Sequence, residues 1–443
     1  MTRSSNKVFS KLNNKLKKLD GNKHKLCLLT KDSYFTREPK KLSFIDDIKI
    51  ILSMGQQSIK KEMYKYFGYD CNVVSAPGFI ESRSKIKEEA FKILMNEINK
   101  YFLCNKTYKG YRLLAVDGSD ITISFDDKDF DTYKNNGKEA RPNSAFHLNA
   151  LYDILNHRYL GAVIQGCKTK NEISAMIEMC ENYNGEKGIF IADRGYNSFN
   201  LFEHIRNIDG YFLIRVKDLG GKTSIINRFK LLPKEGAFDM IVNIIFTNLQ
   251  TNEIKSQPNK YITLMNNQKF DFINKENRFY ETSYRFVRIK IEGVNETYET
   301  LITNLPQDEF TSEDIEKLYK LRWGIEVSYR HLKYSISLNA LHSKRRDFIK
   351  QEIWARMIMF NISMIIVDEA SKTKIKKNER KHEYQINISM AIHLVMSFIK
   401  KKGGAPPNLL ELIAKEILPI RPGRSFERKV KGHSFVSFGY RFN

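Results

Sequence analysis

The sequence lacks the features that mark membrane-spanning, exported or disulfide-bonded proteins. Its longest apolar stretch, Trp354 to Val367, is interrupted by polar residues, and no run of about 18 uninterrupted apolar residues occurs. The N-terminus is polar and lysine-rich, without the apolar segment of a signal peptide. The five cysteines form no C-x-x-C pair and no Cys/His cluster with zinc spacing. These absences predict a cytoplasmic protein with free thiols and no membrane span.

Acidic residues are too few to balance the basic ones. The 443 residues include 74 Lys and Arg against 51 Asp and Glu, which gives a net charge of +23. A positive field of this size favours a polyanionic partner, because neutralising phosphates releases their counterions. Charge alone therefore favours nucleic acid as the partner, with an anionic membrane surface as the second possibility.

The N-terminal part of the chain divides into two segments. The first 41 residues hold 12 Lys or Arg against three acids and show no clear amphipathic period, which predicts a mobile basic arm. Residues 43 to 102 have a helical pattern, with Ser75 as an expected N-cap and Pro77 in the first turn of a helix. Two structures fit this pattern equally: a helix-turn-helix-like reader of DNA, or a plain helical bundle with a charged outer face. In either structure, the third helix carries the charged residues Glu81, Arg83, Lys85 and Lys87.

The pattern changes to strands near Tyr111. The expected order is three antiparallel strands, a helix, a strand, a helix and a strand. The segments are Arg112–Ile123, His147–Leu155, Arg158–Ile164, Asn171–Asn184, Ile189–Ala192, Ser198–Asn207 and Tyr211–Val216. This order is that of an α/β fold with a ribonuclease H-like core, a mixed sheet flanked by helices.

The rest of the chain is predicted to be an insertion followed by helices. Residues 218 to about 308 contain short strand patterns and form a β-rich insertion. Helix returns at Thr311, which has capping-box spacing to Asp314, and persists with breaks to about Leu418. The predicted domains are a basic arm with a helical DNA-binding region (1–105), a catalytic domain (106–345) and a helical basic C-terminal region (346–443).

Two aspartates follow apolar strands. Asp117 is expected to end a buried strand in Ala-Val-Asp-Gly-Ser-Asp, where a charge is costly unless it is paired or bound to metal. Asp193 lies in Ala-Asp-Arg-Gly-Tyr, and Gly195 allows a sharp turn into the next helix. Carboxylates at the ends of neighbouring strands can converge on one Mg²⁺ or Mn²⁺ ion. Each aspartate taken alone is equally explained by a turn or a helix cap. Asp120 is the main rival of Asp117, but it points to the other face of the strand.

A third acid lies in the helical segment Tyr319 to Lys333. Tyr319, Arg322, Glu326 and Lys333 fall within roughly 60° of one another around the helix, with Arg330 beside them. Such a stripe cannot be the apolar face of a core helix. It is either a solvated face with an Arg322–Glu326 ion pair or a site that gives Glu326 to a metal and the other side chains to DNA phosphates.

The spacing Y-x2-R-x3-E-x6-K, after the D-G-S and D-R-G-Y motifs, resembles the insertion-sequence DDE transposases of the IS4 type, whose hallmark is this YREK pattern. The resemblance covers roughly Tyr111 to Arg345, and the basic segment Arg421 to Lys429 is similar to tails in that family. It implies that Asp117, Asp193 and Glu326 bind the metals, and that Tyr319, Arg322 and Lys333 contact DNA near the cleaved end. Arg330, beside this stripe, is a further expected DNA contact.

The resemblance implies a cut-and-paste transposase. Two Mg²⁺ or Mn²⁺ ions would serve in-line displacements first by water and then by a DNA 3′-hydroxyl. The expected partners are the terminal repeats of the element and the target DNA, bound by a homodimer assembled on DNA in the cytoplasm. The helical N-terminal region and the Lys-rich segments Lys372 to Lys381 and Lys400 to Lys402 would grip phosphates.

One departure from the family leaves the hairpin step open. Some relatives stack a flipped base on a tryptophan of the β insertion, whereas this chain has only Trp323 and Trp354, both outside it. Two other functions fit the sequence: a structure-specific nuclease of the same core that cuts without joining, and a catalytically inactive DNA-binding derivative. The three acids count against the inactive derivative.

Overall fold

The computed structural model describes residues 3–36, 41–102, 106–135, 142–219, 224–265, 268–291, 297–372, 383–399 and 408–420. The basic segments predicted at 373–381, 400–402 and 421–429 lie outside these residues. No helix within the described part is long and apolar enough to cross a membrane.

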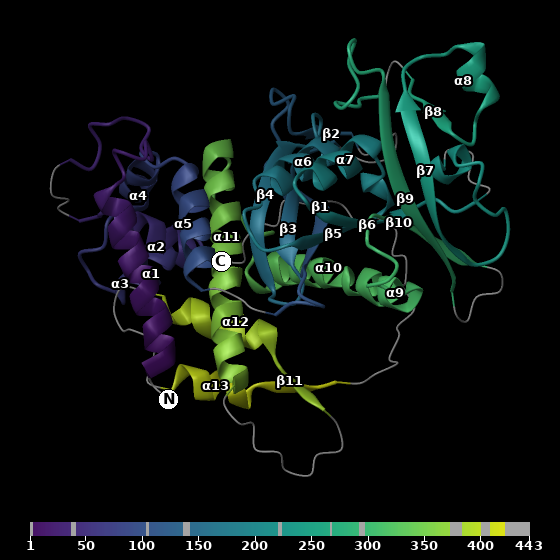
Figure 1. Ribbon diagram of the computed structural model, residues 1–443. Coiled ribbons are helices and arrows are strands. Elements are labelled where there is room, and N and C mark those ends of the chain that lie inside the picture. The colour runs from purple at the N-terminus through teal and green to yellow at the C-terminus, as the bar shows by residue number, and fades with distance from the viewer. Residues whose placement is uncertain are drawn as a thin grey trace.

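The N-terminal region is a bundle of helices beside the long helix α11 (Arg346–Lys372) (Figure 1). Its members are α1 (Arg3–Gly21), α2 (Phe44–Ser53), α3 (Ile59–Phe67), α4 (Ala76–Arg83) and α5 (Glu89–Tyr101). The prediction of a mobile basic arm is wrong for α1. Val8, Leu12, Leu16 and Leu19 recur every three or four residues and are buried, so this lysine-rich helix has an apolar face packed on the core.

Helix α4 begins as predicted, with the Ser75 side chain accepting from Gly78 and with proline in the first turn. Its last residue, Arg83, is only 1% exposed, and its Nη1 lies 2.9 Å from Glu352 Oε1 on α11. A guanidinium buried in this way cannot reach DNA. At Arg83 the structure therefore favours the helical bundle over the DNA-reading helix.

The central sheet has the predicted ribonuclease H-like order. Strands β1 (Arg112–Ile123), β3 (Asn143–Asp153) and β4 (Arg158–Gly166) are antiparallel neighbours. Strands β5 (Gly188–Ala192) and β6 (Tyr211–Val216) follow on the other side of β1, parallel to it. Short β2 (Tyr133–Lys134) pairs with β3. The fold class is thus confirmed, with α6 (Glu172–Glu181) and α7 (Phe199–Asn207) at the expected places.

The predicted insertion is β-rich and extends this sheet. It contains β7 (Phe238–Thr247), α8 (Asn252–Ser256), β8 (Tyr261–Thr263), β9 (Phe279–Lys290) and β10 (Tyr298–Thr303). Strand β10 pairs antiparallel with β6, and the order continues β10-β9-β7-β8. Figure 1 shows these strands leading away from the core on the side opposite the N-terminal bundle. The insertion is therefore a continuation of the core sheet.

The two faces of the sheet are covered by different helices. Leu114 and Val116 of β1 pack in one apolar cluster with α6 and α7. Leu113 and Ala115 point the other way, into a cluster that includes α11 and α10 (Trp323–Arg330). Because side chains alternate along a strand, Asp117 belongs to the α10 face and Asp120 to the α6 face.

Helices dominate the chain after β10. They are α9 (Ser312–Leu321), α10, a π-helical turn η3 (His331–Ser335), α11, α12 (Ile388–Phe398) and α13 (Leu409–Lys415), with a small sheet of β11 (Tyr384–Ile386) and β12 (Ile417–Pro419). The capping box of Thr311 and Asp314 is present. Helix α11 packs on α1, α2, α5, α12, α13 and β4. It thus joins all three predicted domains in one core, and their boundaries stay a prediction.

Candidate active site

Strand pairing brings the two aspartates to neighbouring positions. Ala115 of β1 is the parallel partner of Ile191 of β5, so two residues further along each chain lie Asp117 and Asp193. Asp193 directly follows β5 and accepts a 2.8 Å hydrogen bond from the Gly195 amide on its Oδ1. Both carboxylates are half-buried. Asp193 thus lies at a strand end as predicted, whereas Asp117 lies inside β1, which continues to Ile123. Strand pairing still brings the two acids to neighbouring positions.

Helix α10 brings the third acid to the same place. Glu326 accepts a 3.0 Å hydrogen bond from Arg322 Nη2, which is the predicted i,i+4 pair. One turn later, the Tyr329 hydroxyl lies 2.8 Å from the Asp117 carbonyl oxygen and 3.1 Å from that of Leu148, to both of which it can donate. This hydroxyl links the glutamate-bearing helix to the strand that carries the first aspartate.

The electrostatics of Asp117 show that the other two acids lie close to it. Burial first, and then the charges of Asp193 and Glu326, raise the pKa of Asp117 to about 6 against the opposing effects of the Gly118 amide and Arg322. The site therefore gathers three carboxylates around one partly compensating cation, Arg322. Three hard carboxylate oxygen donors at one place fit a divalent cation such as Mg²⁺ or Mn²⁺.

The other residues of the YREK stripe surround these acids at different depths. The guanidinium of Arg322, 7% exposed, lies 5.6 Å from the ring centroid of Tyr319 and 5.4 Å from that of Trp323. Tyr319 is 5% exposed. Lys333 is half-buried in the π-helical turn, where burial lowers its pKa and the charges of Asp120 and Asp117 oppose that shift.

Arg330 is exposed at the end of α10 and pairs with none of the three acids among the described residues. The structure thus brings Arg322 and Lys333 near the acids, places Tyr319 beside Arg322 and leaves Arg330 exposed at the surface. The DNA contacts of these four residues stay predictions.

Comparison with known proteins decides the family. The family model described as "Transposase DDE domain" matches residues 108–362, which is more than half of the chain. The chain belongs to this family. The domain begins just before β1 and ends within α11, so it contains all seven predicted site residues.

Relatives of the transposase domain include several insertion-sequence transposases. The transposase InsG of IS4 from Escherichia coli is 27% identical over 135 residues, 28% of this chain and 29% of that protein. A putative IS4SA transposase from Synechocystis is 28% identical over 144 residues, 30% of this chain and 43% of that protein. The putative transposase InsL of IS186A from E. coli is 38% identical over 58 residues, 13% of this chain and 16% of that protein. The resemblance to IS4-type transposases is confirmed, although the matches span less than half of each relative.

A solved structure also aligns with most of the chain. The piggyBac transposase in a synaptic complex with hairpin DNA, determined by cryo-EM, gives a TM-score of 0.46 at 11% identity. The alignment covers 96% of this chain and 87% of that one.

A cluster on the opposite face of β1 was not predicted from the sequence. Asp120 Oδ1 lies 2.6 Å from Nδ1 of the buried His147, and Asp120 also pairs with Lys134. These contacts hold the pKa of Asp120 well below its ordinary value. Ligand atoms of Asp120, His147 and Cys167 lie within 4.8 Å of one another, but the paired lysine already neutralises the carboxylate. The rival reading of Asp120 as the metal ligand is therefore weakened. His147 could have been found as the residue facing Asp120 in the β1–β3 pairing.

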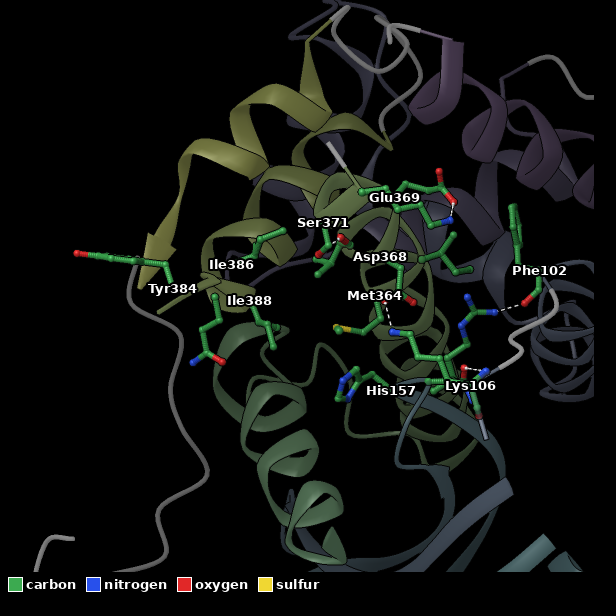
Figure 2. A pocket seen from close by; sticks show the side chains of 16 residues that line it. Phe102, Lys106, His157, Met364, Asp368, Glu369, Ser371, Tyr384, Ile386 and Ile388 are labelled. Atoms are coloured by element: carbon green, nitrogen blue, oxygen red, sulfur yellow. Dashed lines mark hydrogen bonds and ion pairs between the residues drawn. The ribbon is translucent and has the colours of Figure 1, made fainter. Parts of the chain in front are cut away.

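A separate pocket of about 770 Å³ lies beside the turn between β3 and β4. Figure 2 shows His157 and Lys106 on one side of it, with Asp368 of α11 and Ile388 of α12 nearby. Lys106 Nζ lies 3.1 Å from Asp368 Oδ1. None of the seven predicted site residues lines this pocket, so it is distinct from the acidic site of the transposase domain.

Proposed function

We propose that the protein is a DNA transposase that cuts the ends of an insertion sequence and joins them to target DNA. The observation that supports this proposal is the convergence of Asp117, Asp193 and Glu326 from two neighbouring strands and one helix. Membership of the transposase DDE family and the net charge of +23 agree with it. The matched relatives are insertion-sequence transposases, which makes DNA ends the natural substrate.

The three carboxylates would hold the metal, as two ions in our proposal. When bound, Mg²⁺ or Mn²⁺ supplies Lewis-acid stabilisation of the attacking and leaving oxygens during in-line displacement. The protein supplies no nucleophile of its own. The acids would fix the reacting phosphate beside Asp117 of β1, with Arg322 holding Glu326 in place.

The cations near the acids would orient DNA. Lys333 is close enough to Asp117 for their charges to interact, so it can neutralise a phosphate next to the cleaved bond. Arg330, exposed on the same helix, would contact the backbone further along. The Arg322 guanidinium lies near the rings of both Tyr319 and Trp323, and Arg322 is buried, so it would present little of its surface to DNA. We further propose that two protomers assemble on two DNA ends.

The proposal is tested with linear DNA that carries the terminal sequence of the element, a supercoiled target and either Mg²⁺ or EDTA. We expect Mg²⁺-dependent cleavage at the element end followed by joined products. Cleavage without joining would instead identify a nuclease of the same fold. Binding without cleavage in Mg²⁺ and Mn²⁺ would identify an inactive derivative and contradict the proposal.

Removing the hydroxyl of Tyr329 is expected to slow cleavage without abolishing it. Tyr329→Phe keeps the ring and loses the hydrogen bonds to the Asp117 and Leu148 carbonyls, so α10 is held less firmly over β1. We expect a cleavage rate about 10- to 100-fold lower, as for other residues that support metal ligands. Single-turnover cleavage measures this. Tyr334→Phe is the control, because Tyr334 is 68% exposed on the next turn, and an equal loss in both variants would contradict the assigned role.

A further inference from the structure

His147 bridges two carboxylates from different elements. It is 3% exposed on β3, where Nδ1 lies 2.6 Å from Asp120 Oδ1 of β1 and Nε2 lies 2.9 Å from Glu172 Oε1 at the start of α6. The Nδ1 contact with Asp120 is a hydrogen bond, whereas the Nε2 contact with Glu172 is an ion pair of the protonated ring. Burial opposes the charged ring, but the contacts with Asp120 and Glu172 outweigh it and raise the pKa of His147. His147 therefore connects α6 to β1, the strand that carries Asp117.

Other groups around the bridge balance its charge. Lys170 Nζ lies 3.4 Å from His147 Nδ1, 3.6 Å from Glu172 Oε1 and 3.9 Å from Asp120 Oδ1. Lys134 pairs with Asp120, and Cys167 Sγ lies 3.4 Å from Asp120 Oδ1. Two acids thus face three cationic groups, so the cluster does not itself attract a metal ion.

The bridge touches the backbone beside each predicted aspartate ligand. A Cβ atom at Gly118, the residue after Asp117, would lie 2.3 Å from His147 Nε2, so the ring packs directly on this part of β1. On the other side, a Cβ at Gly195 would lie 3.6 Å from Glu172 Oε2. The Gly195 amide is the donor to Asp193 Oδ1. The His147–Glu172 pair therefore lies between the strand of Asp117 and the turn of Asp193.

We propose that His147 is a positioning residue that sets the separation of Asp117 and Asp193, and through it the affinity of the site for a divalent cation. This inference rests on the proposed function. A positioning role and a purely electrostatic role of His147 predict opposite effects on cation binding when the ring is removed. If His147 acts through position, its loss weakens cation binding because the two ligands are no longer held in register. If it acted only through charge, losing a nearby cation would strengthen cation binding.

The test measures Mn²⁺ binding to the purified full-length protein without DNA. Binding is monitored through the electron paramagnetic resonance signal of free Mn²⁺. We expect His147→Ala to raise the dissociation constant about 10-fold or more, the size seen when a residue that orients metal ligands is lost. His204→Ala is the matched control, since His204 also lies between two carboxylates, 2.8 Å from Glu181 and 3.0 Å from Asp271. It should leave Mn²⁺ affinity within about twofold, because its partners lie outside the acidic site.

Gly118→Ala tests the same role of His147 by displacing its ring instead of removing it. The added methyl group must push the His147 ring aside, so this variant should also weaken Mn²⁺ binding. In the Gly118→Ala/His147→Ala double variant the ring is absent, and the combined loss should be smaller than the product of the two single losses. Thermal unfolding identifies any variant that does not fold, and His147→Gln then replaces His147→Ala.

The outcomes separate this inference from the proposed function. Unchanged or tighter Mn²⁺ binding by folded His147 variants, with binding lost in Asp117→Asn, overturns the positioning role alone. Wild-type protein that binds no Mn²⁺, or binds it equally well after Asp117→Asn, overturns the metal site in the proposed function and this inference with it.

Discussion

Replacing Asp117 by asparagine is expected to abolish DNA cleavage and, without metal, to stabilise the protein at pH 7. The pKa of Asp117 is raised from its ordinary value of 3.8 to about 6, so in the folded state its ionised form is disfavoured. A carboxyl pKa that is higher in the folded than in the unfolded state lowers the free energy of unfolding. This loss is complete above pH 6 and disappears as the pH falls below 4. Asparagine removes this cost, which amounts to about 1–3 kcal/mol.

The same substitution removes a ligand from the proposed metal site. We expect cleavage to fall at least about 1000-fold, since several kcal/mol of transition-state stabilisation are lost. Urea unfolding in EDTA at pH 7 and pH 5 measures the stability gain, which should shrink at the lower pH. Single-turnover cleavage in Mg²⁺ measures the activity.

Asp120→Asn is the control, because this residue lies on the same strand with the opposite electrostatics. Its pKa is lowered by His147 first and then by Lys134, against burial. Its ionised form therefore stabilises the fold above its ordinary pKa, and that contribution is lost as the pH falls. Asp120→Asn should destabilise the protein at pH 7. A stability change of the same sign in both variants would contradict this account of β1.

The largest loss of stability is expected from Glu352→Ala. Glu352 is fully buried on α11, where its Oε1 accepts from Arg83 Nη1 at 2.9 Å and its Oε2 from the His342 amide at 2.8 Å. His342 Nδ1 lies 3.1 Å from the same Oε2. Removing the acid leaves cationic groups buried without their counter-charge, which costs about 3–5 kcal/mol.

This contact also connects three distant parts of the chain. Arg83 ends α4 of the N-terminal bundle, and His342 belongs to the segment between η3 and α11. Equilibrium urea unfolding gives the change in free energy. Asp347→Ala is the matched control on the same helix, since the Arg345–Asp347 pair is 55% and 53% exposed and should contribute less than about 1 kcal/mol. A loss below 1 kcal/mol for Glu352→Ala would show that the network does not hold the bundle on α11.

Local signals in the sequence were enough to predict the core and the neighbouring positions of the two aspartates, whose role as ligands stays a prediction. The apolar runs before Asp117 and Asp193 correspond to strands, and the pairing of Ala115 with Ile191 places both acids side by side. The helical spacing of Arg322 and Glu326 left an ion pair as one of two alternatives, and the structure shows that pair. These features depend on residues close in the chain or on the pairing of neighbouring parallel strands.

Features that depend on distant partners were not predictable in this way. The apolar face of α1 was not predicted, because its lysines are interleaved in the sequence with Leu12 and Leu16, which pack on the core. Arg83 had the appearance of a DNA-binding residue, and only the position of Glu352, 269 residues away, shows that it is internal. The bridge of His147 likewise needs Glu172 from another element to be recognised.

The most direct test of the central claim compares Glu326→Gln with Glu316→Gln in Mg²⁺-dependent cleavage of the element end. Both glutamates form an i,i+4 ion pair with a basic residue, Glu326 with Arg322 at 3.0 Å and Glu316 with Lys320 at 2.5 Å, on consecutive helices. Of these two glutamates, only Glu326 raises the pKa of Asp117 through its charge. We predict that Glu326→Gln abolishes cleavage while Glu316→Gln cuts like the wild type. Cleavage that survives Glu326→Gln in the folded protein would show that these three acids are not the active site.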